Sequence, residues 1–213
     1  MAEISSAGAP LCAPSSLSSD GLDRLKTHAR VLHRAAQACQ PDAIARLRFV
    51  PELQVQSGAS TAMHVKRRHC LTVVAKEFGF DHWPHATQAL TEAATIKDFG
   101  KLLYPDRCGG RTHFWSASYA EAQTVRARNN GYLLAYQQQC FVVTEHYIAA
   151  LGLDPLDPDW ELMGRDWIHP LDPQARRRLY DKVIAFAIEH FAEWGPLFAP
   201  TPRTVRFKVA LDP

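Results

Sequence analysis

The chain has 213 residues, of which 46% are hydrophobic and 22% charged, and its formal net charge is +2 at pH 7. This balance is typical of a globular protein and argues against global disorder, and so small a net charge gives no strong field toward nucleic acid or a membrane. No apolar run approaches the ~20 residues that a spanning helix needs, so we expect no transmembrane segment.

The first 19 residues are rich in Ala, Ser and Pro and contain no Lys or Arg. A secretory signal has a basic start and a continuous apolar stretch, so we interpret residues 1–19 as a flexible leader instead. The chain has five cysteines and no CxxC pair: Cys12, Cys39, Cys70, Cys108 and Cys140. Without an export signal this pattern favours thiols over a disulfide framework, and it predicts a cytoplasmic location.

Residues 20–97 are predicted to form helices only. Asp20 can cap a first helix, which Pro41 separates from a short second one. Apolar residues recur along the first helix at spacings of three and four: Leu22, Leu25, Ala29, Leu32, Ala36 and Cys39. Such a stripe is typical of an amphipathic helix that buries one face.

The polar segment 54–61 is predicted to be a turn, and a longer helix follows over 62–78. Gly79 ends that helix, because glycine readily takes the left-handed conformation found after many helices. The sequence Asp-His-Trp-Pro then starts a fourth helix that runs to about residue 94.

The second half has a mixed pattern. The predicted elements, in chain order, are a strand at 112–115, a helix at 118–128, β-prone runs at 132–136 and 140–143, a helix at 145–151, a mostly irregular segment with one short helical turn at 153–172, a helix from 173, and a terminal strand at 205–211. Ser118 and Glu121 have the spacing of a capping box. The two β-prone runs could form a hairpin or one bent strand. The last helix is expected to have Arg176, Arg177 and Arg178 on a stretch that covers its outward side.

The fold class is therefore α+β and mostly helical, with an all-α module at 20–97 followed by a small α+β module at 98–213. The first module holds 11 basic and 7 acidic residues, a net charge of about +4. The second holds 13 basic and 14 acidic residues, a net charge of about −1.

Three stretches carry a resemblance to a known family: LKTHARVLHRAAQ, PDAIARLR and VAKEFGFDHWPHATQAL. The family pattern of an alanine, then Gly-Phe, then Trp-Pro is matched by Ala75, Gly79, Phe80, Trp83 and Pro84. Residues 22–90 thus resemble a small helical module of bacterial proteins that precedes ankyrin-like repeats and glyoxalase-superfamily domains. The resemblance covers about a third of the chain and implies a helical fold without an attached activity. Nothing downstream has the ankyrin period of about 33 residues.

Six histidines lie in the first half: His28, His33, His64, His69, His82 and His85. Their spacing matches no zinc motif, so we interpret them as surface and helix-capping residues. The segment 66–90 has the helix-turn-helix spacing of Ala75 and Gly79, and the basic run Lys66, Arg67 and Arg68 could contact phosphate. The second helix of that pair has no basic residue after its histidine, so nucleic acid is not the favoured partner.

The candidate catalytic residues lie in the second half, at element ends or in irregular segments: His113, Glu145, His146, Asp166 and His169. His113, His146 and a carboxylate could form a metal site of two histidines and one carboxylate. Alternatively, Glu145 or Asp166 could orient a histidine that acts as a general base. A third interpretation is that Asp166 to His169 only fixes a loop by hydrogen bonds and aromatic packing. The metal and any other cofactor stay unknown.

The candidate binding residues are Trp115, Tyr136, Trp167, Cys108 and Arg111. Cys108 lies between Arg107 and Arg111, whose guanidinium groups would favour the thiolate and raise its reactivity, and His113 is the nearest base in sequence. Cys140, in an apolar β-prone run, is expected to be buried and inert.

These patterns favour a binding or interaction protein without catalysis, in which the helical module docks and the α+β module holds a protein or small-molecule partner. One alternative is a small enzyme with a histidine and carboxylate site in the second half. The other is a DNA-binding protein that uses the segment 66–90. The oligomeric state is not predicted.

Overall fold

The structure, a computed structural model, describes residues 20–54, 58–91, 97–108, 114–194 and 196. This part of the chain is mostly helical and contains a three-stranded antiparallel sheet, which confirms the α+β, mostly helical fold class. Among the described helices, none is both long and apolar enough to cross a membrane.

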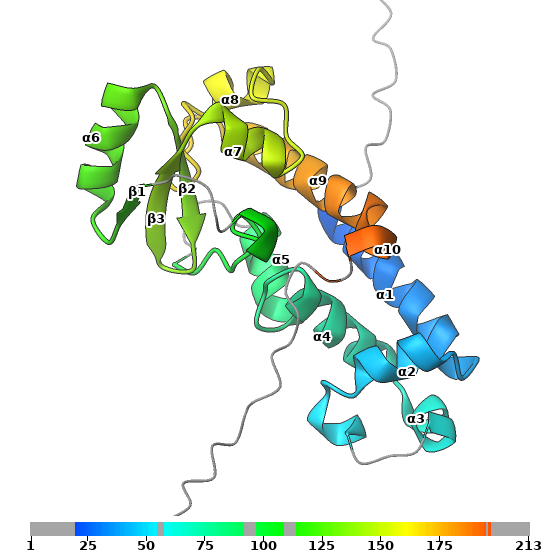
Figure 1. Ribbon diagram of the computed structural model, residues 1–213. Coiled ribbons are helices and arrows are strands. Elements are labelled where there is room, and N and C mark those ends of the chain that lie inside the picture. Colours follow the sequence, from blue (N-terminus) through cyan, green and yellow to red (C-terminus); the bar gives the residue numbers. More distant parts are fainter. Residues whose placement is uncertain (1–19, 55–57, 92–96, 109–113, 195, 197–213) are drawn as a thin grey trace, which may run out of the picture.

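The N-terminal helices are α1 (Gly21–Gln37), α2 (Pro41–Leu47), α3 (Gly58–His64), α4 (Arg67–Glu77) and α5 (Trp83–Thr91), with a 3₁₀ turn at Pro51–Leu53. The later elements are a 3₁₀ turn at Asp106–Cys108, β1 (Phe114–Ser116), α6 (Tyr119–Asn129), β2 (Tyr132–Tyr136), β3 (Gln139–Val143), α7 (Glu145–Ala150), α8 (Pro158–Leu162), α9 (Pro173–Glu189) and α10 (Phe191–Trp194). The molecule is elongated, with α2 and α3 at one end and α6 with the sheet at the other (Figure 1).

The first helix follows its sequence signals. The Asp20 carboxylate accepts a hydrogen bond from the Leu22 N–H, and the predicted apolar stripe from Leu22 to Ala36 is buried. Pro41 begins α2, and Asp172 with Pro173 begins α9. These starts confirm that capping residues and first-turn prolines fix helix boundaries locally.

The prediction of one continuous helix over 62–78 is wrong, because the chain breaks at Val65 and Lys66. Lys66 is extended, and its N–H donates to His69 Nδ1, which caps the start of α4. Val65 and Cys70 are both buried. In an uninterrupted helix, residues five apart point about 140° away from each other, so the break lets both reach the core. The predicted turn also gives way to α3 from Gly58 onward.

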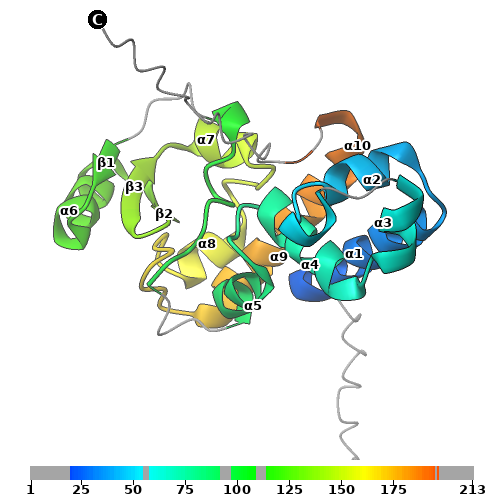
Figure 2. The same ribbon diagram turned by 90° about the horizontal axis from the view of Figure 1, so that it is seen from below.

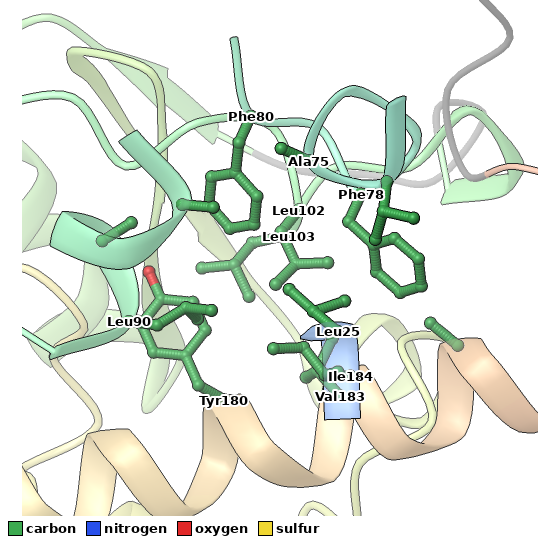
Figure 3. Close-up of a cluster of buried hydrophobic side chains, with 14 of the residues drawn as sticks. Leu25, Ala75, Phe78, Phe80, Leu90, Leu102, Leu103, Tyr180, Val183 and Ile184 are labelled. Atoms are coloured by element: carbon green, nitrogen blue, oxygen red, sulfur yellow. The ribbon is translucent and has the colours of Figure 1, made fainter. Parts of the chain in front are cut away.

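The main hydrophobic core is continuous across residue 97, so helices of both predicted modules build it. Helix α9 lies along α1 (Figures 1 and 2), and the Gly21 N–H donates to the Asp181 carboxylate at 2.7 Å. Figure 3 shows Leu25 of α1 meeting Val183 and Ile184 of α9. The segment with Leu102 and Leu103 reaches the same cluster.

The sheet has the strand order β1-β3-β2, and β2 and β3 form a hairpin, with Leu134 paired to Phe141. Of the two interpretations left open by the sequence, the hairpin is therefore correct. Helix α6 covers one face of the sheet and closes a second, smaller core around Ala122 and Leu133. The expected strand at 205–211 lies outside the described residues.

The second half also departs from the sequence predictions at two side chains. Ser118 caps α6 by accepting from the Glu121 N–H, but the Glu121 carboxylate accepts from the Ser116 hydroxyl at 2.5 Å, so the reciprocal half of the capping box is absent. Arg176 belongs to the run expected to cover the outward side of the last helix. It is instead buried, and it donates to the Trp167 carbonyl at 2.8 Å. A backbone carbonyl that faces α9 thus holds a charge that the sequence alone would place in solvent.

Candidate functional site

A cleft of about 300 Å³ lies between α6 and the chain that follows α8. This volume is at the lower end of the range of small-ligand pockets, about 300–1,000 Å³. The cleft is lined by Tyr119, Gln123, Arg126 and Asn130 from the α6 side and by Glu161, Met163, Gly164, Arg165, Asp166, His169 and Leu171 from the other side.

Helix geometry explains the first wall. Tyr119, Gln123, Arg126 and Asn130 follow one another at spacings of four, three and four, which places them on one face of α6. The Ser118 cap fixes the start of the helix, and Asn130, in the left-handed conformation at φ +47°, ends it. The four residues therefore form a continuous polar stripe along the cleft.

The second wall depends on a chain reversal after α8. Gly164 and Arg165 have φ values of +71° and +51°, and this pair turns the chain toward the sheet. The next residues run along the free edge of β2: the Leu133 N–H donates to the Arg165 carbonyl, and the Trp167 N–H donates to the Leu133 carbonyl, both at 2.9 Å. Backbone pairing to the sheet thus sets the position of Asp166.

Tyr119 and Asp166 connect the two walls. The Tyr119 hydroxyl donates to Asp166 Oδ2 at 2.6 Å, and Asp166 Oδ1 accepts from the backbone N–H groups of Ile168 and His169 at 2.9 and 3.0 Å. Burial, and next the hydrogen bond to the Asp166 carboxylate, raise the pKa of Tyr119 above its usual range. The His169 ring packs edge-on against the Tyr119 ring, with 4.6 Å between the centroids.

The two arginines of the cleft differ in their partners. Arg165 Nε donates to Glu161 Oε1 at 2.8 Å, and its Nη1 donates to the carbonyl and the side-chain oxygen of Asn130 at 3.1 and 3.2 Å. Arg126 Nη1 donates to the Gly164 carbonyl. Arg126 Nε is buried, and within the described part of the chain it has no acceptor.

Of the predicted catalytic residues, Asp166 and His169 lie together in the cleft. Asp166 does not orient the His169 ring, because it accepts from the backbone N–H of that residue. Glu145 and His146 are exposed in the first turn of α7 and do not line the cleft. His113 falls outside the described residues. The described geometry therefore agrees with the interpretation that Asp166 fixes a loop.

Of the predicted binding residues, Trp115 and Tyr136 lie together on the sheet, away from the cleft lining. Their ring centroids are 5.6 Å apart, and both rings contact Tyr104 edge-on. Trp115 is 36% exposed and Tyr136 is half-buried. This pair forms part of an aromatic surface that continues inward to Phe141.

Trp167 and Cys108 are fully buried, so neither can contact a ligand at the surface. Trp167 packs between Trp160 and Tyr180 in the core. A reactive thiol must be accessible, so burial removes the physical basis for the reactivity that the sequence suggested for Cys108. Arg111 falls outside the described residues. Cys140 is buried as expected, and burial raises the pKa of its thiol.

No set of three or more His, Cys, Asp or Glu side chains within the described ranges is arranged to hold a metal ion. The histidines of the first half have structural partners instead. His85 Nε2 lies 2.9 Å from the Asp98 carbonyl, and His64 Nδ1 lies 2.8 Å from the Ser60 carbonyl.

Sequence reasoning missed Tyr119, Gln123 and Arg126. Their spacing places them on one face of α6, but polar residues are ordinary on the outer face of a surface helix, so the sequence did not single them out. On the other wall the sequence indicated Asp166 and His169, whereas the left-handed conformation of Arg165 that positions them cannot be anticipated from residue type.

A scan against protein-family models found no match to this chain, and searches among curated proteins and among solved structures found none either.

Proposed function

We propose that this protein binds a small ligand in the cleft between α6 and residues 161–171 and does not transform it. The observation that carries the proposal is the cleft itself, in which polar groups from two separate elements converge beside the apolar side chains of Met163 and Leu171. Pockets that combine an apolar wall with a few positioned polar groups are typical small-molecule sites.

The hydrogen bonds of the cleft favour binding over catalysis. Asp166 accepts three hydrogen bonds, from the Tyr119 hydroxyl and two backbone N–H groups, which hold this carboxylate in place as a structural group. A raised pKa keeps Tyr119 protonated, so its hydroxyl is not an activated nucleophile. Both features support recognition over catalysis.

The DNA-binding alternative has less support. Lys66, Arg67 and Arg68 lie at the start of α4, whereas the turn to α5 follows the other end of that helix. Arg68 also forms an ion pair with Glu52 at 3.2 Å. The basic run therefore lies at the opposite end of α4 from the turn and from the second helix of the pair.

In this proposal the helical half, residues 20–97, is a docking surface, and the protein is located in the cytoplasm. The described cysteines form no disulfide bonds, which supports a reducing compartment. Docking is motivated only by the resemblance of residues 22–90 to a module that precedes unrelated domains.

The experiment is a fragment screen by ¹H–¹⁵N NMR with anionic, cationic and neutral fragments. Hits should shift the amides of α6 and of residues 164–171. Gln123→Trp, an exposed cleft position, should abolish these shifts by filling the space. The control is Thr124→Trp, an exposed position on the same helix outside the cleft lining. Hits that bind equally well to Gln123→Trp would disprove the site, and so would a complete lack of hits.

A further inference from the structure

We infer that the ligand of this cleft is a small monocarboxylate held by the Arg126 guanidinium. The inference rests on the proposed function and names the class of ligand. Its starting point is that the two arginines of the cleft differ in how many of their N–H groups have acceptors.

Arg165 is neutralised by Glu161, and three of its nitrogens donate to Glu161 and Asn130. Arg126 has only one partner among the described residues, the Gly164 carbonyl, which its Nη1 contacts. No carboxylate of the described ranges lies within ion-pair distance of Arg126. Among the described residues its positive charge therefore has no counterion, and the Gly164 carbonyl holds the group in place.

The unused donor of Arg126 that a ligand can reach is Nη2, which has no acceptor among the described residues. Nε also lacks an acceptor in the described part of the protein, but it is buried and therefore out of reach of a ligand. A carboxylate oxygen can accept a charge-assisted hydrogen bond from Nη2 and pair with the guanidinium charge.

The other charges of the cleft limit the ligand to one negative charge. Glu161 and Asp166 line the same cleft, so the two arginines and two carboxylates cancel formally. Because Glu161 is paired with Arg165, a phosphate dianion would meet one unpaired guanidinium and the Asp166 carboxylate, which makes it a poor match. A monocarboxylate needs only the one unpaired guanidinium charge that Arg126 offers.

The rest of the ligand would lie on apolar surface. Leu171 lines the cleft and is 82% exposed, so it provides the apolar surface, whereas Met163 in the same lining is fully buried. Covering Leu171 with an aliphatic or aromatic group removes apolar area from water, which favours binding. The expected class is therefore a monocarboxylate with a short apolar body.

The test uses four probes on the full chain: hexanoate, hexanamide, hexylammonium and inorganic phosphate. The readout is the Arg126 Nε–Hε signal in ¹H–¹⁵N spectra, assigned by its loss in Arg126→Lys. Hexanoate should shift this signal saturably, whereas the other three probes should leave it unchanged. Arg126→Gln should weaken hexanoate binding by about tenfold or more, because a charge-assisted pair is lost.

The matched control is Arg128→Gln, which removes the same charge from an exposed position of α6 outside the cleft lining. It should leave hexanoate binding within about twofold, since an exposed charge beyond the contact is screened. Equal binding of hexanamide and hexanoate would overturn the carboxylate inference and leave the proposed function intact. If hexylammonium alone shifts the amides of the cleft, the carboxylate inference is likewise overturned and the proposed function stays intact. A cleft that responds to none of the four probes would overturn the inference, and a cleft that also fails the broader fragment screen would remove the proposed function.

Discussion

Tyr119 and Asp166 are joined by a 2.6 Å hydrogen bond across 47 positions of sequence, and this bond ties the two walls of the cleft together. Asp166 is only 5% exposed, and its other oxygen is occupied by two backbone N–H groups. A buried carboxylate needs its full set of donors, so the bond contributes to folding as well as to the shape of the site.

Replacing Tyr119 with Phe should lower the free energy of unfolding by about 1–2 kcal/mol, because the Asp166 carboxylate loses a donor that water replaces poorly. Urea denaturation at pH 7 measures the change. The control is Tyr136→Phe, a half-buried tyrosine whose hydroxyl has no hydrogen bond to another described residue. That variant should stay within about 0.5 kcal/mol of the wild type. Equal losses in both variants would show that the hydrogen bond from Tyr119 to Asp166 does not stabilise the fold.

A second buried network lies where α1, α2, α4 and α10 meet. Arg46 donates to both oxygens of Glu77 at 2.8 and 2.7 Å, and its Nη2 lies 3.3 Å from His28 Nε2. Since an arginine can only donate, His28 Nε2 is the acceptor and the ring proton is on Nδ1. The Arg46 guanidinium lies over the Phe191 ring at 4.9 Å from its centroid. The C-terminal helix is thus held against the helices of the first half.

His28 should make the protein less stable in acid. Burial first, and then the Arg46 charge, lower the pKa of His28 from 6.5 to about 4. Between these pH values His28 is protonated in the unfolded chain and neutral in the folded chain. The free energy of unfolding therefore falls as the pH drops from about 6.5 to about 4. The loss between pH 7 and pH 4.5 should be about 2–3 kcal/mol from this residue.

The measurement is urea denaturation of the wild type and His28→Gln at both pH values. Glutamine can still accept from Arg46 and does not titrate in this range. The wild type should therefore lose more stability than the variant on acidification. Parallel losses in the two proteins would show that other groups cause the acid sensitivity.

The Arg46–Glu77 ion pair can be compared with the exposed Asp23–Lys26 pair of α1. Glu77 is 4% exposed, so Glu77→Gln removes the counterion of a partly buried Arg46 and should cost about 3 kcal/mol. Asp23→Asn breaks the exposed pair with Lys26 and should have no measurable effect. Chemical denaturation of both variants checks this. A Glu77→Gln variant as stable as the wild type would show that the pair is not needed.

Local signals in the sequence predicted most helix boundaries. Asp20, Asp172 and Pro173 act on the turn that contains them, so their effect does not depend on the rest of the fold. The break at Val65 and the burial of Arg176 depend on packing between distant segments. No local pattern contains that information, and periodicity alone assigns both to an ordinary helix.

The candidate site also combines residues that the sequence predicted with residues that only the structure reveals. Asp166 and His169 were predicted from their place in an irregular segment, where chain ends and turns collect polar groups. Their partner Tyr119 and the half-satisfied Arg126 come from another element, and only the pairing of residues 165–167 with β2 brings them together. Residue type identified one wall of the cleft, and tertiary structure supplied the other.

Gly152, which follows α7, packs against Phe186 of α9, and its replacement by Ala should destabilise the protein strongly. Its φ is +84°, a conformation that costs a residue with a Cβ, and an added Cβ would lie 2.0 Å from Phe186 Cδ1. Strain and overlap together should cost about 3 kcal/mol or more. Gly58→Ala is the control, because the nearest atom to its added Cβ is Ile44 Cγ2 at 3.9 Å and the position is helical. That variant should be unchanged or up to about 1 kcal/mol more stable, since alanine favours the helix. Thermal and urea unfolding compare the two, and a Gly152→Ala protein of wild-type stability would mean that α7 and α9 do not approach each other closely at this turn.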